Sequence, residues 1–396
     1  MRVLQTSNPR ELTQIMQDIH VDEYGISIML PKAITHLVKI NSISNITANI
    51  LKQEMLSLGG DVALARGALT GKNKQTDCLL MGSLAQFNRL NAKLKQQPFG
   101  LDKLSKQLSG ALANYQKDSF RLNLGSYRLN LTQRAHIMGI VNITPVSFSN
   151  DGLYDLSLDE IVSRVEELVN DGADIIDVGG ESTRPGARPV SVKEELRRTV
   201  PVIKSLAKKV KVPISIDTYK PEVAKAALDN GAVMVNDITG LRNIKMRKVV
   251  AKYKAGVVIM HMQGSPKTMQ INPEYKSLID DIIEYLDNAA KTALAGGIDE
   301  NRIIVDPGIG FGKTAEHNLE IIKKLSEFRV LGKPMLVGPS RKSFLGKILN
   351  LEPQELIFGT VSACVLAVKN GASLVRVHDV KAVSQALKVL EAIDKT

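Results

Sequence analysis

From His136 onward, the sequence alternates between short apolar segments and longer segments with helical periodicity. Eight apolar segments rich in Val and Ile end in Gly or polar residues, at 136–143, 173–180, 212–218, 233–238, 256–262, 302–308, 334–340 and 373–379. Continuous apolarity is typical of strands that are buried on both faces of a parallel sheet. Eight such strands predict a closed (βα)8 barrel of the TIM type. An open, doubly wound sheet would use the same pattern and is the alternative fold.

The segments between these predicted strands have the spacing of amphipathic helices. They lie at 158–171, 192–209, 221–230, 244–253, 277–295, 315–328, 355–369 and 380–393. Several of them end in Gly, for example at Asp171-Gly172 and Asn230-Gly231. Glycine is favoured there because the residue after a helix often adopts a left-handed conformation.

The length of the chain predicts a second domain. A barrel of this type needs about 250 residues, and the chain has 396. We therefore divide it into an N-terminal α+β domain of unknown function at 1–130 and a TIM-barrel domain at 131–396. In the first domain we expect strands within 25–40 and helices at 45–56, 81–95 and 102–115. Residues 121–131 alternate Leu with polar residues and predict one strand that leads into the barrel.

Composition excludes several classes of function. Trp is absent, and Phe and Tyr are sparse, which argues against binding nucleic acid by base stacking. The two cysteines, Cys78 and Cys364, lack the spacing of a zinc site or a disulfide framework. This cysteine pattern fits a reducing cytoplasm best, which is the location we expect. No run of 18 apolar residues is present, so we expect no membrane span. The net charge of +11 fits an anionic ligand, although a basic excess more often serves only solubility.

Polar residues end several of the predicted strands. Asp217, Asn236 and Asp306 follow the third, fourth and sixth apolar segments. A barrel brings the carboxyl ends of its strands to one rim, where catalytic groups gather. A single Asp at a strand end is often only a helix cap. Together, however, two carboxylates and an amide can hold the amino group and ring N–H of a heterocycle.

Cationic residues are predicted at the same rim. Arg341 and Lys342 follow the seventh strand, Arg376 and His378 lie in the eighth, and Arg184 follows the second. Three separate sources of positive charge favour a phosphate or diphosphate site. The segment 308–314 is rich in glycine but is not a Walker loop, because Pro307 occupies the position of the first required glycine. We expect a tight turn there, with Phe311 projecting as an apolar wall.

The order of these motifs resembles the dihydropteroate synthase family along residues 136–393. The motifs are Met138-Gly-Ile-Val-Asn-Ile-Thr-Pro145, Gly179-Gly-Glu-Ser-Thr-Arg-Pro-Gly186, Ile216-Asp-Thr218, Val235-Asn-Asp237, Asp306-Pro-Gly308, Ser340-Arg-Lys-Ser343 and Arg376-Val-His378. The resemblance implies a transferase of folate biosynthesis. Such an enzyme condenses 6-hydroxymethyl-7,8-dihydropterin diphosphate with 4-aminobenzoate to give 7,8-dihydropteroate and diphosphate.

The resemblance also implies roles for individual residues. The groups that hold the pterin ring would be Asp217, Asn236, Asp306 and Lys342, and its apolar walls Ile238, Met260 and Phe311. The diphosphate and Mg²⁺ site would comprise Asn142 as the metal ligand, with Thr183, Arg184, Arg376 and His378. The neighbours of the aminobenzoate would be Phe148, Pro185, Lys342 and Ser343. Catalysis would depend most on Lys342, Arg376, His378 and Arg184. We also expect a homodimer.

One departure from the family pattern lies in the first loop. The family usually has Thr-Pro-Asp-Ser-Phe-Ser-Asp-Gly-Gly, whereas this chain has Thr144-Pro-Val-Ser-Phe-Ser-Asn-Asp-Gly152. Val146 replaces one Asp, and Asn150-Asp151 replaces or shifts the second. This change predicts a slower enzyme or an altered loop. Together with the additional N-terminal domain, this change keeps one alternative open, a pterin-binding regulatory relative without activity. A second alternative is a pterin-dependent methyltransferase domain, which shares the barrel and the Asp and Asn residues that hold the pterin.

Overall fold

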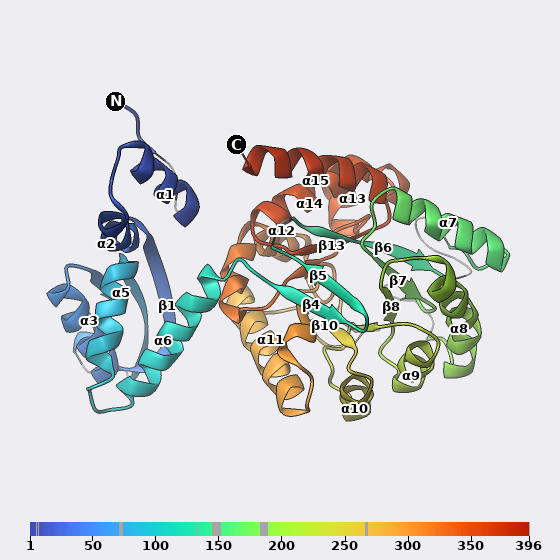
Figure 1. Ribbon diagram of the computed structural model, residues 1–396. Coiled ribbons are helices and arrows are strands. Elements are labelled where there is room, and N and C mark those ends of the chain that lie inside the picture. Colours follow the sequence, from blue (N-terminus) through green and yellow to red (C-terminus); the bar gives the residue numbers. More distant parts are fainter. Residues whose placement is uncertain are drawn as a thin grey trace. The chain divides into compact units, whose positions relative to one another are not determined.

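The computed structural model describes residues 1–4, 6, 8–70, 74–132, 134–144, 152–182, 189–265 and 268–395. The chain divides into two compact units, Met1–Ala113 and Asn114–Thr396. Both units are drawn in Figure 1, where the colours follow the sequence.

The second unit contains eight parallel strands in one sheet. They are β6 (His136–Asn142), β7 (Ile175–Gly179), β8 (Ile214–Asp217), β9 (Met234–Asp237), β10 (Gly256–Met260), β11 (Ile303–Asp306), β12 (Leu336–Val337) and β13 (Leu374–Val377). The order is β11-β10-β9-β8-β7-β6-β13-β12. A parallel bridge between Val305 and Met335 joins the two ends of this order. The sheet therefore closes, which confirms the TIM barrel and excludes the open sheet.

Helices surround this barrel (Figure 1). They are α7 (Leu158–Asn170), α8 (Val192–Lys209), α9 (Pro221–Asp229), α10 (Ile244–Tyr253), α11 (Leu278–Ala295), α12 (Ala315–Lys323), α13 (Ser343–Leu349), α14 (Ile357–Lys369) and α15 (Val380–Asp394), with short 3-10 helices η1 (Glu300–Arg302), η2 (Leu325–Leu331) and η3 (Pro353–Glu355). Their apolar faces pack on the outward side chains of the strands in one core. Among the α-helices described around the barrel, α13 lacks a predicted counterpart, because its seven residues are too short for a periodic pattern.

A β-hairpin closes the amino end of the barrel. Residues 121–131 form β4 (Arg121–Leu124) and β5 (Tyr127–Asn130) rather than the single strand predicted. The chain reverses at Gly125, whose φ of 60° is accessible to glycine at little cost. Leu122 and Leu124 pack against residues at the amino ends of the barrel strands, such as Ile175 and Met234. The hairpin therefore belongs to the barrel unit, although we had placed the domain boundary after residue 130.

A chain that begins at Asn114 is expected to keep the thermal midpoint of the barrel, because residues 114–396 have their own core. A chain that begins at Arg128 lacks Leu122 and Leu124, which are fully buried. Truncating one buried leucine typically costs about 2–5 kcal/mol of stability. Scanning calorimetry of both chains should therefore show a clear drop only in the shorter one. Equal midpoints would contradict this role of the hairpin.

The first unit is an α+β domain, as predicted. Its elements are α1 (Pro9–Asp18), α2 (Glu23–Ala33), β1 (Thr35–Ser44), α3 (Asn45–Ser57), β2 (Asp61–Leu64), α4 (Arg66–Leu69), β3 (Gln75–Ser83), α5 (Leu84–Leu94) and α6 (Leu101–Gln116), the last of which continues past the division into the second unit. The three strands form an antiparallel sheet in the order β1-β3-β2. Alternate residues of β3, such as Cys78 and Leu80, pack on the helices.

Two predictions in this unit are right only in part. Strand β1 covers residues 35–40 of the predicted strand region, but residues 23–33 form a helix, because the Asp22 side chain accepts a hydrogen bond from the Gly25 N–H and caps the helix. Residues 81–83 complete β3 rather than beginning a helix. The helix starts at Leu84, where Ser83 and Gln86 form a capping box.

The described residues contain no helix that is long and apolar enough to span a bilayer. Cys78 and Cys364 are both buried and free, which agrees with the absence of a predicted disulfide.

Candidate active site

The predicted polar residues meet at the carboxyl end of the barrel. The Arg376 guanidinium on β13 donates from Nη2 to Asp217 Oδ2 at 2.8 Å, at the end of β8. It also donates from Nε to Asp177 Oδ2 on β7 at 2.6 Å. The Asn236 amide on β9 donates to the same Asp177 oxygen at 2.9 Å. Four neighbouring groups on four strands therefore form one network, as the barrel geometry predicts.

Asp177 is the residue in this network to which the sequence analysis gave no role. It is fully buried and contacts both Arg376 and Asn236. The sequence already shows Asp177 within an otherwise apolar strand, and an Asp buried in such a strand must be paired. Asp177 and Asp217 each retain a buried Oδ1 without a hydrogen-bond partner among the described residues. Such acceptors suit the N–H donors of a ligand.

Burial shapes the electrostatics of the carboxylates. Burial raises the pKa of Asp217 above its ordinary range, Arg376 opposes this shift, and Asp177 adds to it. Burial also raises the pKa of Asp306 to about 6, although the Gly308 N–H donates to its Oδ1 at 2.6 Å and opposes the shift. Perturbed carboxyl groups of this kind gather at functional sites.

Lys342 runs along the turn after β11, because a Cβ built on Gly310 would lie 3.1 Å from its Cδ and 3.5 Å from its Nζ. Its charge lowers the pKa of Asp217 and of Asp306. Its ammonium also lies 4.3 Å from the centre of the Phe311 ring, a cation–π contact. The positive charge therefore adjoins both the polar and the apolar side of the site.

The predicted apolar walls form one cluster. Ile238 and Met260 pack with Met262 and Met269, and Phe311 borders them. The turn that carries Phe311 is the one predicted from its glycines. Gly308 has a φ of 72°, and a Cβ there would lie 2.0 Å from the His261 carbonyl oxygen, so no other residue fits.

Lys313 is a second residue that the sequence analysis did not assign. It is buried, and its Nζ lies 3.0 Å from His261 Nδ1 and donates to the Phe311 carbonyl oxygen at 3.0 Å. Burial lowers the pKa of the Lys313 ammonium to about 7. Lys313 thus joins the turn after β11 to the end of β10.

The two remaining basic residues, His378 and Arg341, have different partners. His378 lies beside Ser340, with its backbone N–H donating to Ser340 Oγ at 3.2 Å and its Nδ1 3.0 Å from the same oxygen. Arg341, which we expected to contribute to an anion site, forms a two-point ion pair with Asp379 at 3.0 and 2.6 Å. Ser343 is exposed and begins α13. Arg341, in the loop after β12, therefore has a structural partner in the loop after β13.

Several predicted residues lie outside the described part of the chain. They are Phe148, Thr183, Arg184 and Pro185, together with the altered positions Val146, Asn150 and Asp151. Asn142 is described and ends β6. No group of three His, Cys, Asp or Glu side chains that could hold a metal occurs among the described residues.

Comparisons with known proteins show the family to which the barrel is similar. The model of the pterin binding enzyme family matches residues 138–378. A dihydropteroate synthase from Synechocystis is 46% identical over 274 residues, which cover 69% of this chain and 94% of the relative. The solved dihydropteroate synthase of Yersinia pestis, in complex with a sulfonamide drug, superposes with a TM-score of 0.68 at 41% identity, covering 70% of this chain and all of that one.

A third relative extends into the N-terminal unit. A probable bifunctional folylpolyglutamate synthase/dihydropteroate synthase from Halobacterium salinarum is 39% identical over 384 residues. The match covers 95% of this chain but only 45% of that relative, so it includes most of residues 1–113. The family model itself covers more than half of this chain, within the barrel. The chain therefore belongs to the pterin binding enzyme family.

Proposed function

We propose that this chain is a dihydropteroate synthase. It joins the exocyclic methylene carbon of 6-hydroxymethyl-7,8-dihydropterin diphosphate to the amine of 4-aminobenzoate and releases diphosphate and a proton. The observation that carries the proposal is the network of Asp177, Asp217, Asn236 and Arg376 beside Asp306 and Lys342. The named synthases that resemble the barrel support the same reaction.

The described residues suit a bound pterin. The carboxylates of Asp217 and Asp306 can accept hydrogen bonds from the amino group and ring N–H of the heterocycle. The Asn236 amide can meet the adjoining donor–acceptor edge, and Phe311 and Met260 supply apolar faces. Burial strengthens each of these hydrogen bonds because the local dielectric is low.

The reaction needs positioning and charge stabilisation rather than a strong base. An aniline nitrogen is already unprotonated at neutral pH, so it can attack the methylene carbon as the C–O bond to diphosphate breaks. Negative charge then grows on the diphosphate, and Arg376 and His378 are the described groups that can stabilise it, with Arg184 proposed as a third. Lys342 and Ser343, with Phe148, Thr183 and Pro185, are proposed to complete the substrate contacts.

Turnover in vitro tests the proposal. The full chain is mixed with the pterin diphosphate, magnesium and 4-aminobenzoate, and pyrophosphate release is measured with each component left out in turn. Release that requires aminobenzoate supports the synthase. Pterin binding without turnover would instead favour a regulatory relative. Methyl transfer from a methylated pterin to a corrinoid, without diphosphate release, would favour the methyltransferase.

Pterin affinity is expected to fall as the solution becomes more acidic. The pKa of Asp306 is about 6 and that of Asp217 is also raised. A protonated carboxyl accepts fewer N–H hydrogen bonds, so affinity should be full well above pH 6 and lost as pH falls through that value. Calorimetric titration with a pterin that lacks the diphosphate checks this without interference from phosphate ionisation. Constant affinity between pH 5 and 8 would contradict the carboxylate contacts.

We propose that Mg²⁺ binds with Asn142 as its protein ligand. A Cβ built on Gly179 would lie 3.5 Å from Asn142 Oδ1 and 3.7 Å from Asp217 Cβ, so the amide oxygen lies next to the pterin site. Magnesium usually keeps several waters and takes few protein oxygens when it binds phosphates, so one amide fits. When bound, it would neutralise charge on the diphosphate. The substitution Asn142→Ala should raise the magnesium concentration needed for half-maximal turnover.

We also propose that two copies of the chain associate through the barrel. Helices α12, α13 and α14 pack against one another and expose the large apolar side chains of Leu319, Ile348, Leu349, Phe358 and Leu366. Leu351, which follows α13, is also exposed. Phe358 is 82% exposed. Apolar patches of this kind often mark protein interfaces. Analytical ultracentrifugation should show a dimer that Phe358→Asp weakens.

The cytoplasmic location stays a prediction.

A further inference from the structure

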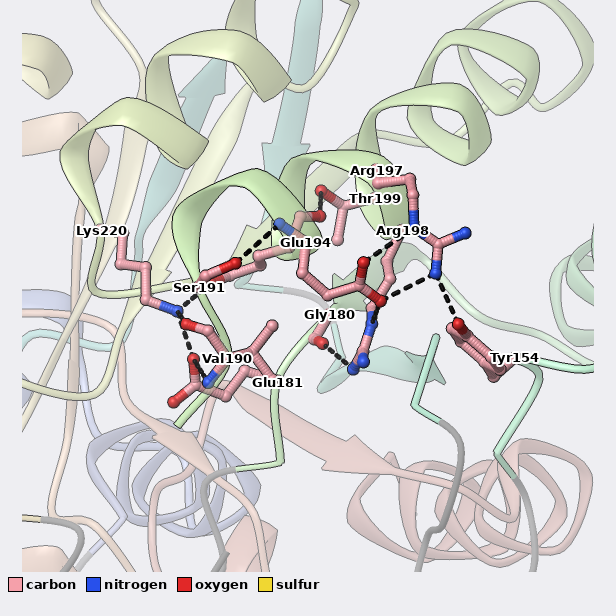
Figure 2. A network of polar contacts seen from close by, with 11 residues as sticks. Tyr154, Gly180, Glu181, Val190, Ser191, Glu194, Arg197, Arg198, Thr199 and Lys220 are labelled. Atoms are coloured by element: carbon pink, nitrogen blue, oxygen red, sulfur yellow. Dashed lines mark hydrogen bonds and ion pairs between the residues drawn. The ribbon is translucent and has the colours of Figure 1, made fainter. Parts of the chain in front are cut away.

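A buried lysine lies close to the pterin site but takes no part in the proposed chemistry. Lys220 follows β8, three residues after Asp217. Its ammonium contacts the carboxylates of Glu181 and Glu195 and donates to the Val190 carbonyl oxygen at 2.7 Å. The Lys220 side chain is 12% exposed and that of Glu195 only 1%. Figure 2 shows Lys220, Glu181 and Val190 converging beside the first turn of α8.

These contacts hold both flanks of one loop. Glu181 follows the glycines at the end of β7, and Val190 precedes α8. The Glu181 carboxylate also accepts hydrogen bonds from the Tyr219 hydroxyl at 3.0 Å and from the Val190 N–H at 3.3 Å. Lys220 therefore ties the two described ends of the second βα loop to each other and, through Glu195, to α8.

The lysine is difficult to replace because of its charge. Burial alone would lower the pKa of Lys220, but the hydrogen bonds to Glu181 and Glu195 raise it, so the ammonium stays charged. Without it, two carboxylates would lie buried together with no counter-ion, which is unfavourable.

Helix α8 also contacts the end of β7 and the segment before α7. Arg198 donates to the Gly180 carbonyl oxygen at 3.0 Å and to Glu194 at 2.8 Å. The guanidiniums of Arg197 and Arg198 lie 5.5 and 5.1 Å from the centre of the Tyr154 ring, in the segment before α7 (Figure 2). The first turns of α8 therefore provide a fixed support against which Lys220 holds the loop.

We propose that Lys220 is a positioning residue for the second βα loop, acting through Glu181, Val190 and Glu195. The inference rests on the proposed function, in which Thr183, Arg184 and Pro185 contact the diphosphate and the aminobenzoate. Among the described residues, the Lys220 ammonium pairs with Glu181, Val190 and Glu195 and not with Asn236 or Asp306. Its effect therefore falls on the substrates that the loop is proposed to contact. Recognition of the pterin ring itself should be preserved.

The test compares Lys220→Met with the unmodified full chain. We expect kcat/KM for aminobenzoate to fall by about tenfold to a hundredfold, because small displacements of contact groups have effects of this size. Binding of a pterin without diphosphate, measured by calorimetry, should change by less than about twofold, because the groups proposed to hold the pterin ring keep their positions. Hydrogen exchange of the peptide that contains Val190 should accelerate, because its N–H hydrogen bond to Glu181 loses support.

Two further variants make the test decisive. Glu181→Gln keeps the size of the side chain but removes one charge, so it should give a smaller change in the same direction even if Lys220→Met does not fold. Lys291→Met alters an exposed lysine that pairs with Asp287 on α11 and should change nothing. Equal loss of pterin binding and aminobenzoate use, or no change in either variant, would overturn the proposal. If the unmodified chain lacks turnover, the proposed function fails instead, while pterin binding and hydrogen exchange can still be measured.

Discussion

Replacing Lys342 with alanine is expected to lower kcat/KM for the pterin diphosphate by on the order of 10²–10³, the usual effect of removing one preorganised charged donor. The Lys342 ammonium lowers the pKa of both Asp217 and Asp306 and lies 4.3 Å from the Phe311 ring centre. The substitution removes positive charge from the centre of the site without opening the core, since Lys342 is only partly buried. Steady-state kinetics with each substrate measures the effect.

The matched control for this prediction is Lys347→Ala. Lys347 lies in the same short helix as Ser343, is exposed, and is not part of the proposed site. The Lys347→Ala substitution should leave both kcat/KM and the thermal midpoint unchanged. Near-normal kinetics in the Lys342→Ala enzyme would refute the role assigned to Lys342.

Arg376→Met should impair both turnover and folding. The guanidinium is the counter-ion of Asp177 and Asp217, and without it neither buried carboxylate would have an ion-pair partner among the described residues. Breaking a buried ion pair by removing one partner typically costs about 3–5 kcal/mol of stability. A loss in rate on the order of 10²–10³ should accompany it, because Arg376 is also proposed to stabilise the leaving diphosphate. Chemical denaturation and pyrophosphate release measure the two effects separately.

The pH dependence of this variant has a definite sign. Arg376 lowers the pKa of Asp217, so the pKa of that carboxyl should rise further without it. A carboxyl whose pKa is higher in the folded than in the unfolded state stabilises the fold below its unfolded pKa, and the stabilisation is lost as pH rises through the folded value. The stability deficit of Arg376→Met should therefore shrink between pH 7 and pH 5. A deficit that grows on acidification would contradict the pairing.

A second substitution separates the effect of Arg376 on stability from its effect on turnover. Adding Asp177→Asn to Arg376→Met removes one of the two uncompensated carboxylates while keeping an acceptor for the Asn236 amide. Stability should partly recover, because less unpaired charge is buried. Turnover should not recover, because the cation that faces the leaving group is still missing. Recovery of turnover would show that Arg376 serves only folding.

The sequence by itself determined the barrel and most of the site. The eight apolar segments were sufficient to predict the strands because a strand buried on both faces has no room for polar alternation. Once the barrel is predicted, its geometry brings Asp217, Asn236 and Asp306 to one rim whatever their separation in the chain. The tight turn at Gly308 was also predictable, because its conformation depends on local residues.

Only the tertiary structure decided which charges pair. Arg376 contacts Asp177 across 199 positions of sequence, and Arg341 pairs with Asp379 instead of contributing to the anion site. Periodicity carries no information about such contacts, because they depend on side-chain direction in the assembled barrel. The same holds for residues 25–33, which form a helix although strands are predicted within 25–40. Their apolar pattern suits either structure, so the capping and packing of the folded unit select one of them.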